Sequence, residues 1–274
     1  MNEHAPHTKS PETIAYAADR LLEFFANNVV GDITIAKCRE YLQYRQSGKQ
    51  RVKVSVGSVK RELDVLQAAI NYDYKNGTLT APRPVWKPPL QKSKERWLTK
   101  DEAKKLFTAA EESNTEYLPL FIALALYTGA RKAAILQLKW SQVDLINKRI
   151  DYNAVGDTQS NKKRALIPIA EPIIPLLIKA KERGLDNGYV IHINQKPIKD
   201  IKRSFNNACK KANLYDVTPH TLRHTCATWL AQAGVPFPEI AKYIGHNNSR
   251  TTENIYAHHS PDYLKNAVNV FNKT

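Results

Sequence analysis

Four prolines fall within residues 81–96, and five basic residues share this stretch. Because proline fixes φ and has no backbone N–H, a segment this rich in proline continues neither a helix nor a sheet and is typical of an extended connection. The chain has 274 residues, which is room for two domains of ordinary size. We therefore predict one domain over residues 1–80, a linker over residues 81–96 and a second domain over residues 97–274.

The chain is strongly basic, with 41 Lys and Arg against 26 Asp and Glu and a formal net charge of +15. Residues 91–274 carry +11 of this charge. A protein this basic attracts polyanions, of which nucleic acid is the commonest. Solubility charge on an ordinary enzyme is the alternative, and charge alone does not distinguish DNA, RNA and an anionic membrane.

Nothing in the sequence indicates a membrane or secreted protein. The longest apolar run, residues 118–126, is about half the roughly 20 residues that a bilayer-spanning helix needs. The first residues are polar and lack the apolar core of a signal peptide. Three cysteines without close pairing exclude a disulfide scaffold and a Cys-rich zinc module. We expect a soluble protein of the cytoplasm.

Apolar residues at helical spacing predict two helices in the first domain. One runs through residues 16–25. The other runs from residue 59 to about residue 74, with Ser58 as its cap and Asn76-Gly77 at its end. The first domain is therefore expected to be all-α.

A basic run with interleaved Tyr41 and Tyr44 lies between these two helices. Its functional interpretation is a surface that follows the phosphate backbone of a nucleic acid. A solvated helix face is the alternative. The candidate contacts to DNA in this run are Arg39, Arg45, Lys53 and Lys60.

The second domain is predicted to be mainly helical. Thr99 and Glu102 form a capping box that opens a helix. Residues 117–127 predict a buried helix that ends at Thr128-Gly129. From Pro172 onward the chain is again mostly helical in pattern.

One small antiparallel sheet interrupts these helices. Residues 149–153 and 164–169 have the composition of strands, and the polar residues 156–163 join them, which predicts a hairpin. The second domain is therefore expected to be α+β, mainly α with a small antiparallel β-sheet.

Five residues of the second domain follow a recognisable order. Arg131 comes directly after a Thr-Gly turn, and His220, Arg223, a Gly245-His246 pair and Tyr256 follow it along the chain. Each spacing alone occurs by chance, whereas the whole order is specific. In this order the second domain resembles the tyrosine recombinase (phage integrase) family, and the helical first domain resembles that family's core-binding domain less specifically.

The resemblance implies a two-domain clamp on double-stranded DNA that acts as a site-specific recombinase. Such an enzyme cleaves and rejoins DNA through a covalent 3′-phosphotyrosyl intermediate, with no metal or other cofactor. Its partners would be DNA and further copies of itself, with a tetramer in synapsis, exchange of the C-terminal helix and accessory DNA-bending proteins. The expected role is integration or excision of a phage or other mobile element at the nucleoid, and chromosome-dimer resolution is the second possibility.

The residue types suit this chemistry. The planar fork of Arg donates two parallel hydrogen bonds to a phosphate and keeps its charge, so Arg131 and Arg223 are expected to neutralise the transition state. Tyr256 is the expected nucleophile, and a phenol with a pKa of about 10 needs a base. The resemblance gives the role of base to His220 and a hydrogen bond to the phosphate to His246.

The sequence departs from the family pattern at two places. Ala134 stands where the family often has an acidic residue, three positions after Arg131. The family's hairpin lysine, which protonates the leaving 5′ hydroxyl, is missing at its usual spacing. We expect Lys162 to fill this role, with Lys163 as the alternative. The other interpretation is that both are solvated lysines of the turn with no catalytic role.

Further polar residues carry weaker hypotheses. Residues 196–211 are basic, and Lys199, Lys202 and Arg203 are candidate DNA contacts of the kind that position a protein without reading sequence. A zinc site on His220, His224 and Cys226 lacks a clear further ligand and is disfavoured. We interpret His224 as a buried support for its helix, and His258 and His259 as surface residues.

Ser260-Pro261-Asp262 predicts the start of a short C-terminal helix. Its apolar stripe is expected to pack either on its own domain or, as the resemblance implies, on a neighbouring subunit. This stripe consists of Leu264, Ala267, Val268 and Phe271.

Two rival functions stay open at this point. One is a non-catalytic DNA-binding protein built on a recombinase fold, and the other is a type IB topoisomerase. The missing hairpin lysine favours the first rival slightly, whereas the complete Arg, His, Arg, His and Tyr set opposes it.

Overall fold

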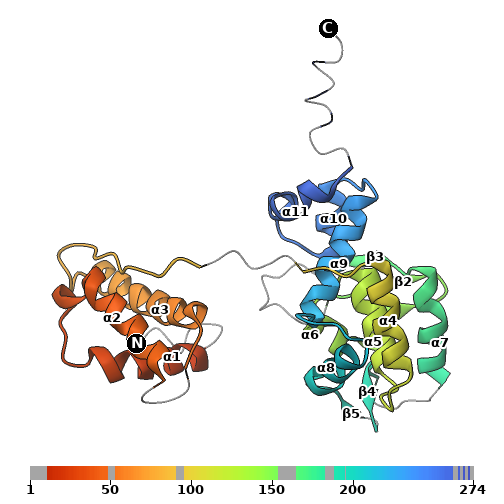
Figure 1. Ribbon diagram of the computed structural model, residues 1–274, viewed down its shortest axis with the longest axis horizontal. Helices are drawn as coiled ribbons and strands as arrows, with labels where there is room; N and C mark the ends of the chain where they lie inside the picture. Colours follow the sequence, from red (N-terminus) through yellow and green to blue (C-terminus); the bar gives the residue numbers. More distant parts are fainter. Residues whose placement is uncertain are drawn as a thin grey trace. The chain divides into compact units, whose positions relative to one another are not determined.

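A computed structural model describes residues 11–48, 53–90, 96–153, 165–182, 188–194 and 196–261, together with Lys265, Val268 and Phe271. The chain forms two compact units, unit 1 (Met1–Ser93) and unit 2 (Lys94–Thr274) (Figure 1). In the described part of the chain, no helix is long and apolar enough to cross a bilayer.

Unit 1 is helical throughout its described residues. It consists of α1 (Pro11–Phe25), a short 3-10 turn η2 (Val30–Asp32), α2 (Ile35–Ser47) and α3 (Val56–Lys75). The predicted helices over residues 16–25 and 59–74 are confirmed, but the predicted cap is wrong. Ser55 caps α3, because its Oγ accepts the backbone N–H of Ser58 at 3.2 Å. The buried side chains that hold the three helices together include Leu21, Phe25, Cys38, Tyr41 and Leu63.

A buried ion pair joins α2 to α3 and corrects the expected role of Arg45. Arg45 donates from Nε and Nη2 to the two carboxylate oxygens of Glu62, at 3.0 and 2.8 Å. Tyr41 Oη donates to the same carboxylate at 2.7 Å. The carboxylate raises the pKa of Arg45 and, after burial, also that of Tyr41. Because Arg45 is buried and fully engaged, it is a structural residue and not a phosphate contact.

The first half of the predicted linker is extended, as expected, but it packs on unit 1. The side chain of Gln67 in α3 donates to the carbonyl of Arg83 at 3.0 Å and accepts the N–H of Val85 at 2.6 Å. Val85 is buried, and Lys87 pairs with Asp64 at 2.6 Å. The chain therefore divides between residues 93 and 94, later than the predicted end of the first domain at residue 80.

Among the helices of unit 2, α5 (Leu118–Thr128) is buried over almost its whole length. The others are α4 (Lys100–Glu111), α6 (Lys132–Leu136), α7 (Ile174–Glu182), α8 (Lys202–Lys211), α9 (Pro219–Gln232), α10 (Phe237–Ile244) and α11 (Ser249–Tyr256), with 3-10 turns η3 (Trp140–Gln142), η4 (Glu171–Ile173) and η5 (Ala257–His259). The Thr99 capping box and the helix end at Gly129 are confirmed. Helices α4, α6, α7 and α9 pack against α5. Helices α10 and α11 pack against each other and against α9, on the part of unit 2 that lies away from α8 (Figure 1).

The predicted hairpin is confirmed as β2 (Arg149–Asp151) paired antiparallel with β3 (Leu166–Pro168). Ile150 faces Ile167 in the register, and both are buried. A third strand, β1 (Val143–Asp144), adds to β2, and a separate pair forms from β4 (His192–Ile193) and β5 (Lys196–Pro197). These extra strands have two residues each, too few to show an alternating pattern in the sequence.

Candidate active site

Four separate segments of unit 2 bring polar side chains together. Helix α9 supplies His220, Arg223 and His224, and Arg131 stands at the N-cap of α6. His246 follows the end of α10, and Tyr256 is the last residue of α11. The charge of Arg131 acts on Arg223, His220 and His246, and His224 contacts Tyr256. The five residues that the sequence order singled out therefore meet at one place.

Helix α9 is capped at the end that carries the site. Thr218 caps it, because its Oγ accepts the N–H of Thr221 at 3.3 Å and its own N–H is accepted by the Thr221 hydroxyl at 3.0 Å. Residues three and four apart share one helix face. His220, Arg223 and His224 therefore point to the same side.

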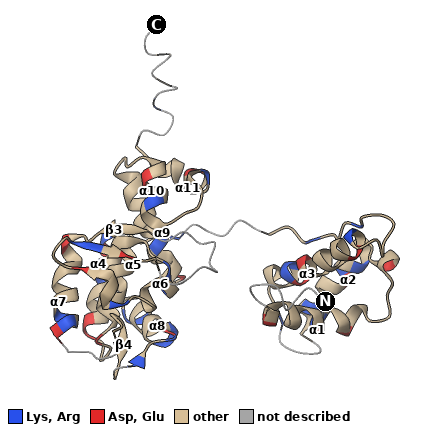
Figure 2. Cartoon of the chain, turned by 180° about the vertical axis from the view of Figure 1, so that it is seen from behind, with Lys and Arg blue, Asp and Glu red and all other residues tan. Residues whose placement is uncertain are grey.

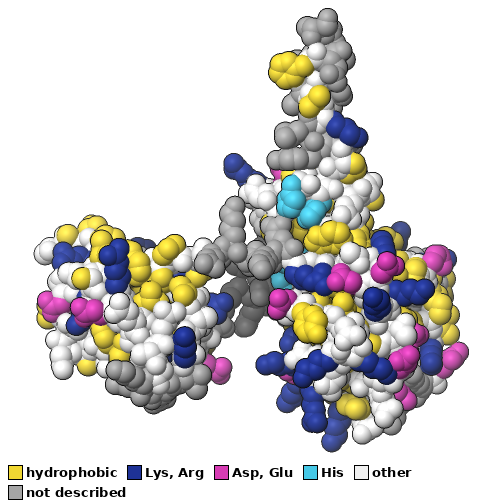
Figure 3. Space-filling view, viewed as in Figure 1, with side chains coloured by type: hydrophobic (Ala, Val, Ile, Leu, Met, Phe, Trp, Pro, Cys, Tyr) yellow, Lys and Arg dark blue, Asp and Glu magenta, His cyan; other side chains and the backbone are white. Residues whose placement is uncertain are grey.

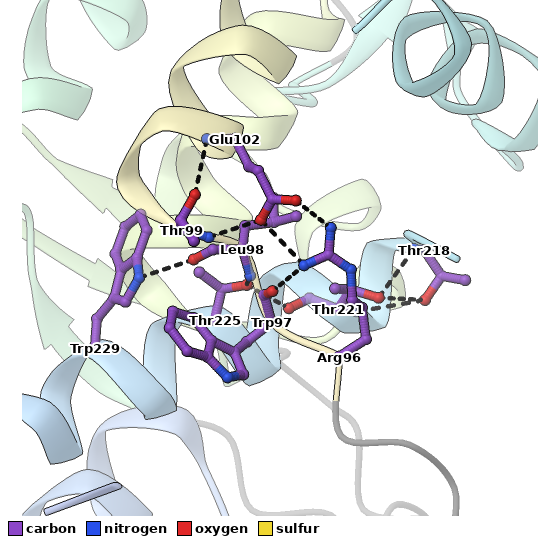
Figure 4. A network of polar contacts seen from close by, with 9 residues as sticks. All are labelled: Arg96, Trp97, Leu98, Thr99, Glu102, Thr218, Thr221, Thr225 and Trp229. Atoms are coloured by element: carbon purple, nitrogen blue, oxygen red, sulfur yellow. Dashed lines mark hydrogen bonds and ion pairs between the residues drawn. The ribbon is translucent and has the colours of Figure 1, made fainter. Parts of the chain in front are cut away.

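The segment that enters unit 2 braces the same helix (Figure 4). The N–H of Leu98 donates to Thr225 Oγ at 2.9 Å, and its carbonyl accepts the indole N–H of Trp229 at 3.0 Å. The guanidinium of Arg96 donates two hydrogen bonds, of 3.0 and 2.6 Å, to the carboxylate of Glu102 at the start of α4. The entry segment thus links α9 to the start of α4.

The guanidinium of Arg223 is buried, with only 3% of the residue exposed. Its Nη1 donates to the carbonyls of Gly129 and Ile244 at 2.6 and 2.5 Å. Its Nη2 has no hydrogen-bond partner among the residues that the structure describes. Burial, followed by the charge of Arg131, lowers the pKa of Arg223 to about 10. A buried cation beside a second cation favours a bound anion, which would satisfy Nη2.

Gly129 makes this arrangement possible through its lack of a side chain. It has φ of +60°, and a Cβ at this position would lie 2.7 Å from Cγ2 of Ile244 and 3.2 Å from Sγ of Cys226. The end of α5 can therefore approach α9 and α10 closely enough for Arg223 to reach its carbonyl. Arg131 follows two residues later.

We expect Gly129→Ala to destabilise unit 2 by about 1–3 kcal/mol from backbone strain, with an added cost from the clash with Ile244. Urea denaturation measures this loss. Gly234→Ala is the matched control, because Gly234 follows α9 with φ of +78° and a Cβ added there would meet nothing within 4 Å. An equal loss of unfolding free energy in the two variants would contradict the close approach of the end of α5 to α9 and α10.

His246 is positioned by the end of α10. Gly245 adopts φ of +71°, and the N–H groups of Gly245 and His246 donate to Lys242 and Ala241 at 3.2 and 2.8 Å. A glycine in the left-handed conformation with hydrogen bonds back into the last turn is a common helix end. Nδ1 of His246 lies 2.8 Å from the hydroxyl of Thr252. Burial, and then the charges of the two arginines, lower the pKa of His246 to about 4, so its ring is neutral at neutral pH.

His220 lies on the first turn of α9 and keeps part of its side chain exposed. Partial burial of its ring, and then the neighbouring His224, Arg223 and Arg131, lower its pKa to about 4. Its ring meets the ring of His224 edge-on, with 4.5 Å between the centroids. His220 is therefore also neutral at neutral pH.

Tyr256 is 3% exposed and packs in a cluster with Cys226, Ala227, Ile240 and Ile244. Its Oη lies 2.6 Å from Nδ1 of His224. The interpretation of His224 as a support for its helix missed this contact, because residues 32 positions apart show no relation in the sequence. The one available signal was its place four residues after His220, on the face that carries Arg223.

Two further predictions concern the hairpin and α6. Lys162 and Lys163 lie outside the described residues, so the hairpin lysine stays a prediction. Ala134 is buried in α6, one turn after Arg131.

The candidate DNA contacts of unit 2 lie on a basic surface. Lys199, Lys202 and Arg203 are exposed, whereas Phe205 and Ala208 on the opposite face of α8 are buried. Lys and Arg gather over α8 and the β4–β5 pair at one end of the unit (Figure 2 and Figure 3). This surface is open to a polyanion, and contact with DNA stays a prediction.

The candidate contacts of unit 1 differ in their surroundings. Arg39 and Lys53 are exposed, and Lys60 is partly buried. The Arg39 guanidinium lies over the ring of Trp86 at 5.4 Å, and Lys60 pairs with Asp64 at 3.4 Å. All three stay predicted contacts.

A metal site finds no support in this arrangement. Across the part of the chain that the structure describes, no group of three or more His, Cys, Asp or Glu side chains is placed to hold a metal ion. Among the described residues, His220, His224 and Cys226 are therefore not arranged as a zinc site, and this interpretation stays disfavoured.

Two arginines, three histidines and a buried tyrosine thus lie together on a mainly helical domain. Comparison with known proteins gives the family of this domain. Residues 96–262 match the model of the phage integrase family, and the chain belongs to this family of site-specific tyrosine recombinases.

Individual relatives are similar over nearly the whole chain. The integrase of Salmonella phage P22 is 25% identical over 96% of this chain and 75% of its own length. The tyrosine recombinase XerA of Pyrococcus furiosus is 26% identical over 95% of this chain and 88% of its own. The solved structure of the XerH recombinase on its difH substrate, a post-cleavage complex, shares the fold with a TM-score of 0.72 and 18% identity, over 96% of this chain and 80% of that one.

Proposed function

We propose that this chain cuts and rejoins double-stranded DNA at a specific site through a covalent 3′-phosphotyrosyl intermediate, with Tyr256 as the nucleophile. The observation that carries the proposal is the buried Arg223, whose Nη2 is left for an anion beside Arg131. A phosphodiester is the anion that fits such a fork. Integration or excision of a mobile element is the proposed role, with chromosome-dimer resolution as the alternative use of the same chemistry.

The residues divide the work of the reaction. Arg131 and Arg223 neutralise the negative charge that builds on the non-bridging oxygens. We assign Nδ1 of the neutral His246 as the acceptor of the Thr252 hydroxyl. Its proton then lies on Nε2, which donates a hydrogen bond to the phosphate. A neutral imidazole of α9 takes the phenolic proton, a role that the resemblance gives to His220.

The remaining steps are protonation of the leaving 5′ oxygen and rejoining of the strand through the phosphotyrosyl ester. The leaving 5′ oxygen takes a proton from the hairpin lysine, Lys162 or Lys163. The phosphotyrosyl ester keeps the energy of the broken bond, so the rejoining step needs no ATP. A DNA hydroxyl attacks this ester and releases Tyr256.

Binding to DNA is proposed to use both units. The basic surface of α8 and the exposed Arg39 and Lys53 of unit 1 would track phosphates on the duplex. Accessory DNA-bending proteins and action at the nucleoid in the cytoplasm belong to the same proposal.

Assembly is proposed to use the end of the chain. The structure describes Lys265, Val268 and Phe271 there as helical, with Val268 and Phe271 exposed at 55% and 79%; the other residues of the predicted stripe lie outside the described residues. Exposed apolar side chains of this kind fit exchange with a neighbouring subunit in a synaptic tetramer.

We expect deletion of residues 262–274 to abolish cooperative binding to a two-site DNA, because the exchanged helix is lost, while binding to a single site is kept. Gel-shift titrations on one-site and two-site fragments measure both. Unchanged cooperativity on the two-site fragment would contradict helix exchange.

Covalent trapping tests the proposed function. Labelled DNA fragments from either side of the element that carries the gene are incubated with the protein in EDTA, denatured and run on an SDS gel. The proposal predicts a protein–DNA adduct on these fragments and none on unrelated DNA.

The rivals predict other outcomes of the same experiment. Tight and specific binding without an adduct would favour the non-catalytic DNA-binding protein. Adducts on any DNA, together with relaxation of any supercoiled plasmid, would favour the topoisomerase.

A further inference from the structure

We propose that His224, and not His220, takes the proton of Tyr256 when this tyrosine attacks the phosphate. The inference rests on the proposed function of Tyr256 as the nucleophile and names the base for its first step.

The contact itself is the first observation. Nδ1 of His224 lies 2.6 Å from Oη of Tyr256, which is within the range of a short and strong hydrogen bond. Tyr256 is 3% exposed, so bulk water does not reach the phenol to accept its proton. An acceptor inside the protein is needed, and His224 already occupies that place.

The position of His220 is the second observation. His220 lies one helical turn before His224 and is exposed, whereas His224 is half-buried. It touches His224 edge-on, at 4.5 Å between ring centroids. This contact packs the His220 ring against the His224 ring, which makes His220 the neighbour of the base.

The surrounding charges suit a base that is neutral before the reaction. The titratable and charged groups around His224 are His220 and Arg223 of α9, His246 after α10 and Tyr256 of α11, and η5 also packs against α9. Burial and the charge of Arg223 lower the pKa of His224, which favours the neutral ring. In the tautomer that carries its proton on Nε2, Nδ1 accepts from the phenol. A phosphodiester between the two arginines would offset their charge and make a protonated His224 less costly when the proton arrives.

The step balances as a simple displacement. Oη of Tyr256 forms a bond to phosphorus while the bond from phosphorus to the 5′ oxygen breaks. The phenolic proton moves to Nδ1 of His224, and the 5′ oxygen is protonated at the DNA end by the hairpin lysine. Rejoining runs the same transfers in reverse, with His224 returning the proton to Tyr256.

Single-turnover adduct formation, measured from pH 6 to pH 10 with saturating DNA from the element's ends, tests the proposal. The wild-type rate is expected to be flat above about pH 7, because the base is neutral there. His224→Asn places an amide near the Nδ1 position and keeps a hydrogen bond to Tyr256 without accepting the proton. Its rate is expected to fall about 100-fold at pH 7 and to rise about tenfold per pH unit towards the phenol pKa near 10.

Two comparisons isolate the effect. His224→Gln, whose amide lies near the Nε2 position, should be slower than His224→Asn, because it loses the hydrogen bond as well as the base. His258→Asn is the matched control, an exposed histidine two residues after Tyr256, and its rate should follow the wild type at every pH.

If His220 were the base, the pH profiles of the variants would differ. A flat profile for His224→Asn, with the rising profile in His220→Asn, would overturn the proposal and leave the proposed function intact. No adduct from the wild-type protein at any pH would overturn the proposed function itself, and the inference with it.

A second measurement does not depend on a variant that folds. In ¹⁵N-histidine-labelled wild-type protein, the chemical shifts of the His224 ring are expected to show an unprotonated Nδ1 and a protonated Nε2 at pH 7. A proton on Nδ1 would make His224 the donor to Tyr256 and would overturn the proposal.

Discussion

Tyr256→Phe is expected to bind its DNA site as the wild type does and to form no covalent adduct. Phenylalanine keeps the ring that packs against Cys226, Ile240 and Ile244, so the fold is retained at a cost of about 1 kcal/mol for the lost hydrogen bond to His224. Without Oη no ester forms, and no other group replaces a nucleophile of this kind. Gel shifts measure the binding, and SDS gels measure the adduct.

Tyr243→Phe is the matched control for this variant. Tyr243 packs beside the same cluster, and its Oη donates to the carbonyl of Tyr127 at 2.7 Å. It therefore loses a comparable hydrogen bond without touching the proposed chemistry, and adduct formation should persist. An adduct from Tyr256→Phe at the wild-type rate would contradict the assignment of the nucleophile.

Arg223→Lys is expected to lower the rate of adduct formation by about 10²–10³-fold at saturating DNA. Nη1 of Arg223 holds two carbonyls while Nη2 is left for the phosphate, and a single ammonium cannot place donors at all three positions. The change keeps the positive charge, so a loss of this size measures the geometry of the fork. Rapid-quench kinetics with labelled DNA gives the rate.

Arg83→Lys provides the comparison for that substitution. The Arg83 guanidinium also donates to a carbonyl, that of Gly31 at 2.7 Å, but it lies in unit 1. Its rate of adduct formation should equal the wild-type rate. An Arg223→Lys enzyme as fast as Arg83→Lys would contradict the proposed role of the fork.

The order of a few residues, through the resemblance, predicted which side chains would meet, and several of them lie close to a helix start or end. Gly129 and Gly245 end α5 and α10, and Thr218 caps the start of α9; each lies within two residues of a site residue. Local signals of this kind are readable without a fold. The meeting of Arg131, Arg223 and Tyr256, by contrast, was predicted only through the resemblance, because local signals do not say which helix ends come together.

Contacts between residues far apart in the chain could not be predicted from the sequence. Arg45 was expected on the surface because it lies in a basic run, yet its partner Glu62 is 17 residues away on another helix. A signal was present, since Arg45 follows Cys38 and Tyr41 on one helix face and both of these are buried. A charge on an apolar face needs a buried partner, and that partner becomes visible only when α2 packs on α3.

The contact between His224 and Tyr256 belongs to the same class. Nothing in the spacing of these two residues distinguishes His224 from His220 as the partner of the phenol. Only the packing of α11 against α9 makes that choice.

The most direct test of the whole account is the site of the covalent link. The adduct formed in EDTA is digested with nuclease and trypsin, and the peptide that carries a nucleotide is fragmented in a mass spectrometer. Trypsin cuts after Arg250 and Lys265, so the expected peptide spans residues 251–265 and contains Tyr263 as well as Tyr256. The account predicts the nucleotide on Tyr256; a nucleotide on Tyr263, or on any residue outside this peptide, would contradict it.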